Sequence, residues 1–280
     1  MNGFKSFLLI AALTGLLVWI GNYFYGQTGL VLALGAGLLM NAFAYFFSDS
    51  LVLASYGARV VSRQEAPVLY DMVATLSQRA GLPMPRIAVI PEETPNAFAT
   101  GRNPEHAVVA VTEGIMQALS RQELEGVLAH ELGHVKHRDI LIGSLAAVLA
   151  QAIMFISHLV PYFMPRREDD DGPNPILALA VMIFGPVAAM LLQMALSRSR
   201  EYMADEYSAH LTGRPDLLAS ALARISGWNA QAPMRSAQPA TAHMMIVNPL
   251  TGGGLMSLFS THPPLQRRIE RLEAMPIEAR

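Results

Sequence analysis

The chain of 280 residues contains no cysteine. Disulfide bonds and thiolate metal ligands are therefore excluded, and any metal ion must bind to His, Asp or Glu side chains. Charged residues are also scarce, at 15% of the chain, whereas an average soluble domain has about a quarter. The formal net charge is −2 and no basic stripe is present, so we expect no nucleic acid as the main partner.

Apolar residues make up 52% of the chain and are concentrated in four long runs. A bilayer core about 30 Å thick requires about 20 apolar residues of helix, and each run has that length. The runs are residues 6–25, 29–47, 140–163 and 176–196. They divide the chain into an N-terminal transmembrane pair (1–50), a first polar block (51–139), a transmembrane hairpin (140–196) and a second polar block (197–280).

Two alternatives to this topology stay open. Lys5 gives the first run a small basic start, as in a cleaved signal peptide, although the run is long and a second follows at once. The second pair contains polar residues and prolines and is also compatible with a buried or re-entrant hairpin. Of the 20 Lys and Arg residues only Arg166 and Arg167 lie in the hairpin loop, so the positive-inside rule predicts that both termini and both polar blocks face the cytosol.

The polar blocks predict an α-rich domain with a little sheet. Helical periodicity covers residues 64–80, strand-like runs follow at 86–90 and 106–111, and a short helix is expected near 113–119. Ser120 precedes Glu123 by three residues, which is typical of a capping box that begins a helix ending near Arg138. Further helices are expected after residue 197 and at the C-terminus, and residues 228–259 are expected to be loops.

The predicted helix at 121–138 carries the sequence His130-Glu131-Leu132-Gly133-His134, an HExxH pattern. Residues i and i+4 lie on one helix face, so His130 and His134 can bind a single Zn²⁺. Glu131 lies beside them and can take a proton from a metal-activated water during peptide hydrolysis. Coincidence on an amphipathic helix is the alternative, but a capped helix in a polar domain is the context that this chemistry requires.

A catalytic zinc needs a third protein ligand and an open position. Glu201 follows the fourth apolar run by about one turn, and a two-span hairpin would return it to the side of His130 and His134. Asp205, four residues later, is suited to hold a ligand imidazole through its free N–H. The alternative for both acidic residues is a solvated helix next to the membrane.

With these motifs in place, the sequence resembles the HtpX family of integral-membrane zinc metalloproteases, related to the CAAX prenyl proteases. The resemblance covers nearly the whole chain and rests on NAFATG at 96–101, HELGHVKHRD at 130–139, SRSREYMADEYSA at 197–209 and FSTHPPLQRRI at 259–269. It implies an α-helical membrane protein with a cytosolic α+β zincin-like metalloprotease domain, built on the HExxH helix and a small sheet. It also implies one Zn²⁺ per chain, held by His130, His134 and Glu201.

The implied activity is a stress-linked quality-control endopeptidase of the bacterial inner membrane. Its substrates would be unfolded or damaged membrane proteins, and other membrane proteases are candidate partners. The resemblance also implies that Asn96, Ala97, Phe98 and Ala99 form an edge segment that binds extended substrate through its main chain, where a loop with a buried Phe98 is the alternative. His262 and Arg268 are candidates for stabilising the oxyanion, with a helix N-terminus and a structural ion pair as alternatives.

Two other functions would leave different marks in the sequence. A metal transporter should carry its ligands inside the spans, which contain only His158 and no carboxylate. A non-catalytic membrane protein with a structural zinc site is the remaining alternative, although such a site has no use for Glu131.

Overall fold

The computed structural model describes residues 2–150, 198–232, 234, 236–238, 240–249 and 263–277. Residues 151–196, which form most of the expected transmembrane hairpin, lie outside this part of the chain, as does His262.

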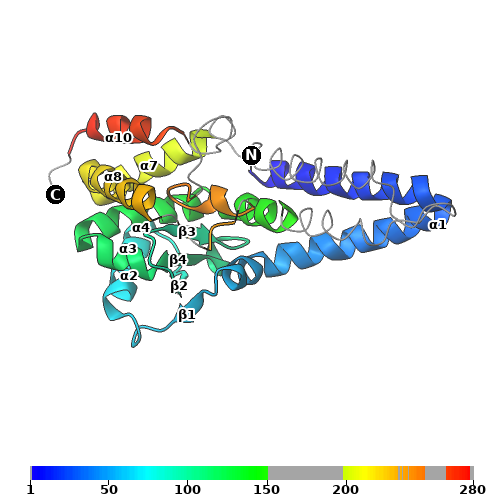
Figure 1. The fold of residues 1–280 in the computed structure, drawn as a ribbon, viewed down its shortest axis with the longest axis horizontal. Helices are drawn as coiled ribbons and strands as arrows, with labels where there is room; N and C mark the ends of the chain where they lie inside the picture. The colour runs from blue at the N-terminus through cyan, green and yellow to red at the C-terminus, as the bar shows by residue number, and fades with distance from the viewer. Residues whose placement is uncertain are drawn as a thin grey trace.

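Helix α1 (Asn2–Ser55) is interrupted at Gly26, whose φ of 59° and ψ of −146° are not helical. The two halves run back along each other and project from the rest of the molecule (Figure 1), and Asn41 Nδ2 donates a hydrogen bond to Thr14 Oγ1 across them at 2.7 Å. The predicted helix pair is thus confirmed as a pair of helices, with the second ending at Ser55 rather than near residue 50.

Among the described residues, one helix, Tyr25–Ser55, is long and apolar enough to cross a membrane, with a mean hydropathy of 2.0. Its large side chains face outwards, as Leu32 and Leu39, exposed by 68% and 74%, illustrate. Such a surface is typical of contact with lipid rather than water. Membrane crossing by residues 6–25 stays a prediction.

A four-stranded sheet in the order β1-β2-β4-β3 forms the centre of the domain. Strand β1 (Arg59–Val61) pairs antiparallel with β2 (Arg86–Ile90), β2 pairs parallel with β4 (Val108–Thr112), and β3 (Ala97–Thr100) pairs antiparallel with β4 at the outer edge. The strand predicted at 86–90 is confirmed. The one predicted at 106–111 begins later, because residues 104–106 form a 3-10 turn.

The helices follow most of the predicted ranges. They are α2 (Pro67–Ala80), α3 (Glu113–Ala118), α4 (Arg121–Lys136), α7 (Arg198–Thr212), α8 (Pro215–Gln231) and α10 (Leu265–Glu273), with 3-10 turns at Pro104–His106 and Ala242–Met244. Proline occupies the first position of α2 and of α8. An N–H at this position has no partner within the helix, so its absence from proline costs no hydrogen bond. The loop expected from residue 228 was wrong for 228–231, because α8 continues to Gln231.

Both faces of the sheet are buried, and alternate residues of each strand enter different cores. Ile87 and Val89 of β2 pack with helices α2, α4 and α8 in the larger core. Their neighbours Ala88 and Ile90 pack on the opposite face with Val52 and Leu53 of α1 and with Tyr56, which follows its last residue. The projecting hairpin is therefore joined to the domain through the core of the sheet.

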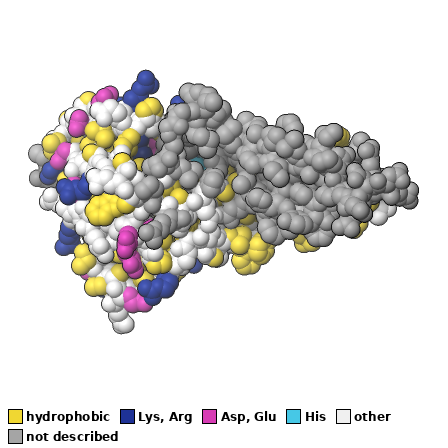
Figure 2. Space-filling view, in the orientation of Figure 1, with side chains coloured by type: hydrophobic (Ala, Val, Ile, Leu, Met, Phe, Trp, Pro, Cys, Tyr) yellow, Lys and Arg dark blue, Asp and Glu magenta, His cyan; other side chains and the backbone are white. Residues whose placement is uncertain are grey.

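The surface of the domain carries mixed charge. On the face seen in Figure 2, Lys and Arg side chains alternate with Asp and Glu side chains, in keeping with a formal net charge of −2.

Candidate active site

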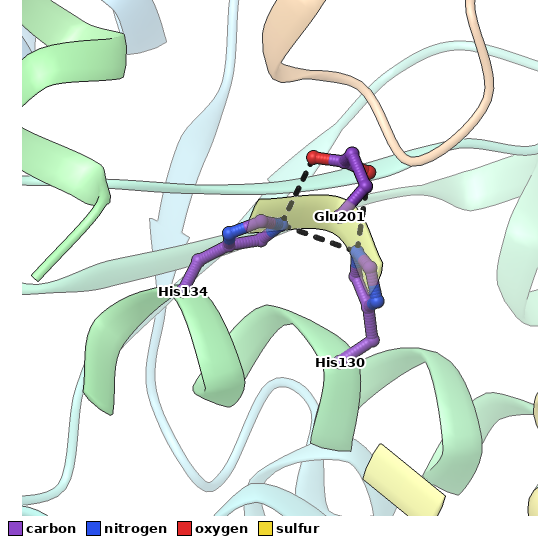
Figure 3. Close-up of side chains that lie close together, drawn as sticks. All are labelled: His130, His134 and Glu201. Carbon is purple, nitrogen blue, oxygen red and sulfur yellow. Dashed lines mark hydrogen bonds and ion pairs between the residues drawn. The ribbon is translucent and has the colours of Figure 1, made fainter. Parts of the chain in front are cut away.

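Helix α4 begins with the predicted capping box. Ser120 Oγ accepts from Glu123 N at 3.2 Å, and Glu123 Oε2 accepts from Ser120 N at 2.8 Å. Two helix-terminal N–H groups are satisfied in this way, which fixes the start of the helix. One turn separates His130 from His134 on this helix, and both imidazoles point to the same side (Figure 3).

Helix α7 packs closely against α4 because the motif contains a glycine. A Cβ atom at Gly133 would lie 3.2 Å from both Ala204 Cα and Tyr207 Cδ1, which is tighter than ordinary contact. Ser208 Oγ also donates to the Gly126 carbonyl at 2.7 Å. These contacts bring α7, and with it Glu201, over the histidines from across the hairpin segment.

The three expected ligands converge. His130 Nε2 and His134 Nε2 are 3.2 Å apart, and the Glu201 carboxylate oxygens lie 3.8 Å from the first and 3.5 Å from the second. A tetrahedral ion with ligand bonds of about 2.0–2.1 Å would separate its ligand atoms by about 3.3–3.4 Å. The two imidazoles and the carboxylate therefore fit a divalent metal such as zinc (Figure 3).

A carboxylate lies behind each imidazole. Asp205 Oδ1 is 3.0 Å from His130 Nδ1, as expected for this residue, and Asp139 Oδ2 is 3.5 Å from His134 Nδ1. Such partners orient a metal-binding imidazole and increase its basicity. Asp139 was not predicted, although it closes the HELGHVKHRD motif. It reaches His134 because Arg138 adopts a left-handed φ of 58° and Asp139 N–H bonds back to the His134 carbonyl at 2.9 Å.

The two histidines differ in protonation. Burial lowers the pKa of His130 to about 4, against the opposing effect of Asp205, so this imidazole is neutral and ready to bind a metal. Burial acts in the same direction on His134, but the carboxylates of Asp139, Glu201 and Glu131 raise its pKa to about 9. A metal ion would have to displace that proton.

Glu131 is buried beside the three ligands, with 1% of its surface exposed. Among the described residues its carboxylate oxygens accept no hydrogen bond from a side chain, and the Ala99 backbone lies beside them. Burial, reinforced by the charge of Glu201, raises the pKa of Glu131 to about 7, with His134 and Arg268 opposing. A carboxylate with this pKa can accept and return a proton near neutral pH.

Arg268, proposed from the sequence to stabilise an oxyanion, is fully buried and bound within the network. It donates two hydrogen bonds to Asp205, at 2.9 and 2.7 Å, and one to the Ile246 carbonyl at 2.9 Å, and Nη1 lies 3.3 Å from Glu201 Oε2. These contacts fit a residue that positions Asp205 and Glu201. The oxyanion role of Arg268 stays a prediction, and that of His262 falls outside the described residues.

The predicted substrate-binding segment lies at the sheet edge next to α4. Ala97, Phe98 and Ala99 belong to β3, the outermost strand, and Asn96 immediately precedes it. The Phe98 ring packs into the core against Tyr56, with centroids 5.7 Å apart; the alternative expected a loop with a buried Phe98, and the segment is instead a strand in which Phe98 is buried. Edge position and buried ring are compatible, because side chains and backbone groups of a strand point in different directions.

Comparison with known proteins assigns the chain to a family. The model of peptidase family M48 matches residues 63–276. Proteins named protease HtpX homolog are similar over nearly the full length: the one from Pyrococcus furiosus is 52% identical over 98% of this chain and 96% of its own, and that from Ralstonia nicotianae is 52% identical over 98% and 96%.

Among solved structures, the crystal structure of S. mikatae Ste24p aligns with a TM-score of 0.55 at 18% identity. It covers 97% of this chain but only 65% of the Ste24p chain, and it supports the fold alone. The family match spans both α4 with its HExxH motif and α7 with Glu201. The chain therefore belongs to peptidase family M48 and is a metalloprotease.

Proposed function

We propose that this protein is a membrane-bound, zinc-dependent endopeptidase in which His130, His134 and Glu201 hold one zinc ion and Glu131 is the general base. The observation that carries the proposal is the convergence of the three side chains. The two Nε2 atoms are 3.2 Å apart, Glu201 Oε2 lies 3.8 Å from His130 Nε2, and Glu201 Oε1 lies 3.5 Å from His134 Nε2. One ligand atom from each residue can therefore bind a single metal ion.

The chain's own residues account for proton transfer and positioning. A bound zinc ion would supply Lewis-acid chemistry, lowering the pKa of a water molecule and polarising the peptide carbonyl. Glu131, buried beside the candidate ligands, would take the proton of the attacking water and pass it to the leaving amine. Asp205 and Asp139 hold the imidazoles in place, and Arg268 holds Asp205.

We further propose that the substrates are unfolded or damaged membrane proteins. The enzyme would be a multi-pass protein of the cytoplasmic membrane that cleaves them on the cytosolic side, with a role in stress-linked quality control. The exposed apolar surface of α1 supports a membrane location, and Lys and Arg placement supports the orientation. The core shared by α1 and the sheet keeps the site close to the membrane.

The alternative is a membrane protein in which the metal is only structural. Structural zinc sites usually have four protein ligands, whereas three ligand residues form the cluster among the described residues and a buried carboxylate stands beside them. Zinc content and casein cleavage should be measured for the wild type and for Glu131→Gln. We expect full zinc occupancy in both and loss of cleavage by several orders of magnitude in the variant. Equal cleavage by both proteins would refute the proposed mechanism, and zinc with no cleavage in either would favour the structural alternative.

A further inference from the structure

The outer edge of strand β3 is bonded to another part of the same chain. Thr112 N–H donates to the Asn96 carbonyl at 3.0 Å, so the backbone groups of Asn96 and Phe98 point towards β4. Those of Ala97 and Ala99, which alternate with them, point away from the sheet. On that outer side Ile246 N–H donates to the Ala97 carbonyl at 2.9 Å. We call residues 245–247 the cover segment.

Ile246 and Val247 are held through their backbone. The Ile246 carbonyl accepts from Arg268 Nη1 at 2.9 Å, and the Val247 carbonyl accepts from Asn96 Nδ2 at 2.9 Å. Val247 N–H lies 3.5 Å from Asn96 Oδ1. The cover segment thus makes these contacts through its backbone alone and uses none of its own side chains for them. Strand-adding sites bind peptides of varied sequence in the same way. The side chains of the cover segment are selected for apolar character: Ile246, 1% exposed, enters the larger core with Val247 packed against it, and Met245, 0% exposed, enters the smaller core.

The cover segment lies next to the proposed catalytic residues. Arg268 Nη1, which contacts the Ile246 carbonyl, is also 3.3 Å from Glu201 Oε2. Ala99 is the next residue of β3 after Ala97 whose backbone groups face the outer side. Its backbone lies close to the Glu131 carboxylate. A peptide bonded to this edge would therefore extend past the proposed metal ligands and the base.

The chain leading to the cover segment is tied to the membrane end of the domain. Thr241 and Tyr56 share a short hydroxyl hydrogen bond, and Gln238 Nε2 donates to the Ser55 carbonyl at 3.2 Å. His243 Nε2 is 3.1 Å from the Gly143 carbonyl, at the start of the third apolar run. Attachments at both places connect the edge of β3 to the elements expected to enter the bilayer.

We propose that the cover segment is an internal occupant of the substrate site, and that an extended peptide with an apolar side chain at the position of Ile246 must displace it to be cleaved. This inference rests on the proposed endopeptidase function and adds its regulation. The apparent affinity for substrate is then the intrinsic affinity multiplied by the fraction of molecules in which the segment has left. A change that weakens the segment without touching Asn96, Ala97 or Arg268 should tighten substrate binding.

A first experiment uses proline to remove one hydrogen bond. Met245 has φ −73° and ψ 141°, which is the backbone conformation favoured before proline, so Ile246→Pro should lose mainly the N–H that donates to Ala97. Ile246→Val keeps that N–H and is the matched control. In the Glu131→Gln background, binding of a short fluorescent peptide with alternating apolar residues should be about threefold to tenfold tighter for Ile246→Pro than for Ile246→Val. Equal or weaker binding by Ile246→Pro, at unchanged zinc content and unfolding temperature, would overturn the inference.

A second experiment does not depend on how the proline variant folds. The chain has no cysteine, so Ile246→Cys in the Glu131→Gln background carries a single thiol, at a position that is buried in the resting protein. Saturating peptide should increase its rate of maleimide labelling several-fold, while Leu222→Cys, equally buried in α8, should show no change. Labelling at position 246 that peptide leaves unchanged or slows would contradict displacement. Casein cleavage by the wild type tests the proposed function separately, so the two failures are distinguishable.

Discussion

Asp205→Asn tests the buried network behind the proposed zinc site. Asp205 is 2% exposed and is the partner both of His130 Nδ1, at 3.0 Å, and of Arg268, at 2.9 and 2.7 Å. Asparagine preserves the shape but removes the charge and replaces one acceptor oxygen with a donor. Because Arg268 donates to both Asp205 oxygens, the new donor faces an Arg268 N–H in either orientation and at least one hydrogen bond is lost. The guanidinium then stays buried without its closest anionic partner, although Glu201 still lies 3.3 Å from it.

Two magnitudes follow from this geometry. Removing one member of a buried ion pair costs about 3–5 kcal/mol of folding free energy, and we expect about 3 kcal/mol because one acceptor oxygen is kept. Zinc affinity should fall by about 10–100-fold, the usual cost of losing the partner that orients a ligand imidazole. The cost to zinc affinity should exceed that of any surface substitution, because His130 is 1% exposed and solvent has little access to replace Asp205.

The assay is zinc competition with a chromophoric chelator, together with thermal unfolding with and without zinc. Glu131→Gln is the background in every case, so that self-digestion does not distort either measurement. Asp216→Asn is the control, because Asp216 pairs with Arg214 on the surface, where both side chains are about 40% exposed, and exposed pairs contribute about 0–1 kcal/mol. Zinc affinity of Asp205→Asn within about threefold of the background would show that Asp205 does not support the metal site.

Three further predictions concern the ligand, the helix cap and the topology. Glu201→Gln should weaken zinc binding more than Asp205→Asn does, because a charged ligand becomes a poor neutral one; equal affinity with the wild type would place the third ligand elsewhere. Although burial opposes ionisation, hydrogen bonds from Ser220 and Ser120 and the charge of Arg224 lower the pKa of Glu123. The stabilising effect of the ionised Glu123 is therefore present above its ordinary pKa and lost as pH falls through the lowered value. At pH 7 the free energy of unfolding of Glu123→Gln should be about 1 kcal/mol below that of the wild type, which lowers the unfolding temperature. The difference should disappear in strong acid. Single cysteines near positions 60, 120 and 205 should be labelled from the cytosolic side of the membrane and one near 170 from the opposite side; labelling of 170 from the cytosol alone would make the second pair of apolar runs re-entrant.

Local patterns were sufficient to predict the part of the site that lies on one helix. The capping box places the start of α4, and the four-residue spacing of His130 and His134 puts both imidazoles on one face. Glu201 could be predicted from topology, because a hairpin of two spans returns the chain to its starting side. Each of these inferences needs only the sequence within one element or the order of elements.

The rest depends on contacts between distant segments. Asp139 faces His134 only because Arg138 adopts a left-handed conformation that is uncommon for arginine. Arg268 meets Asp205 from 63 positions away, and the cover segment meets β3 through hydrogen bonds that no sequence pattern marks. Strands β1 and β3 have only three and four residues, too few for alternation to be distinguished from chance.

The charges of the candidate site account for the different pKa shifts of His130, His134 and Glu131. Glu131, Glu201 and Asp205 can carry three negative charges in a buried space where Arg268 supplies one positive charge, while Asp139 is offset by Arg200 at 3.8 Å. The described residues therefore leave two positive charges missing, the charge of one divalent cation. These charges favour protonation in the described site: burial and Glu201 raise the pKa of Glu131 to about 7, and nearby carboxylates raise that of His134 to about 9. A zinc ion bound to His134 and Glu201 would remove the need for both protons, which would leave Glu131 ionised and able to act as a base.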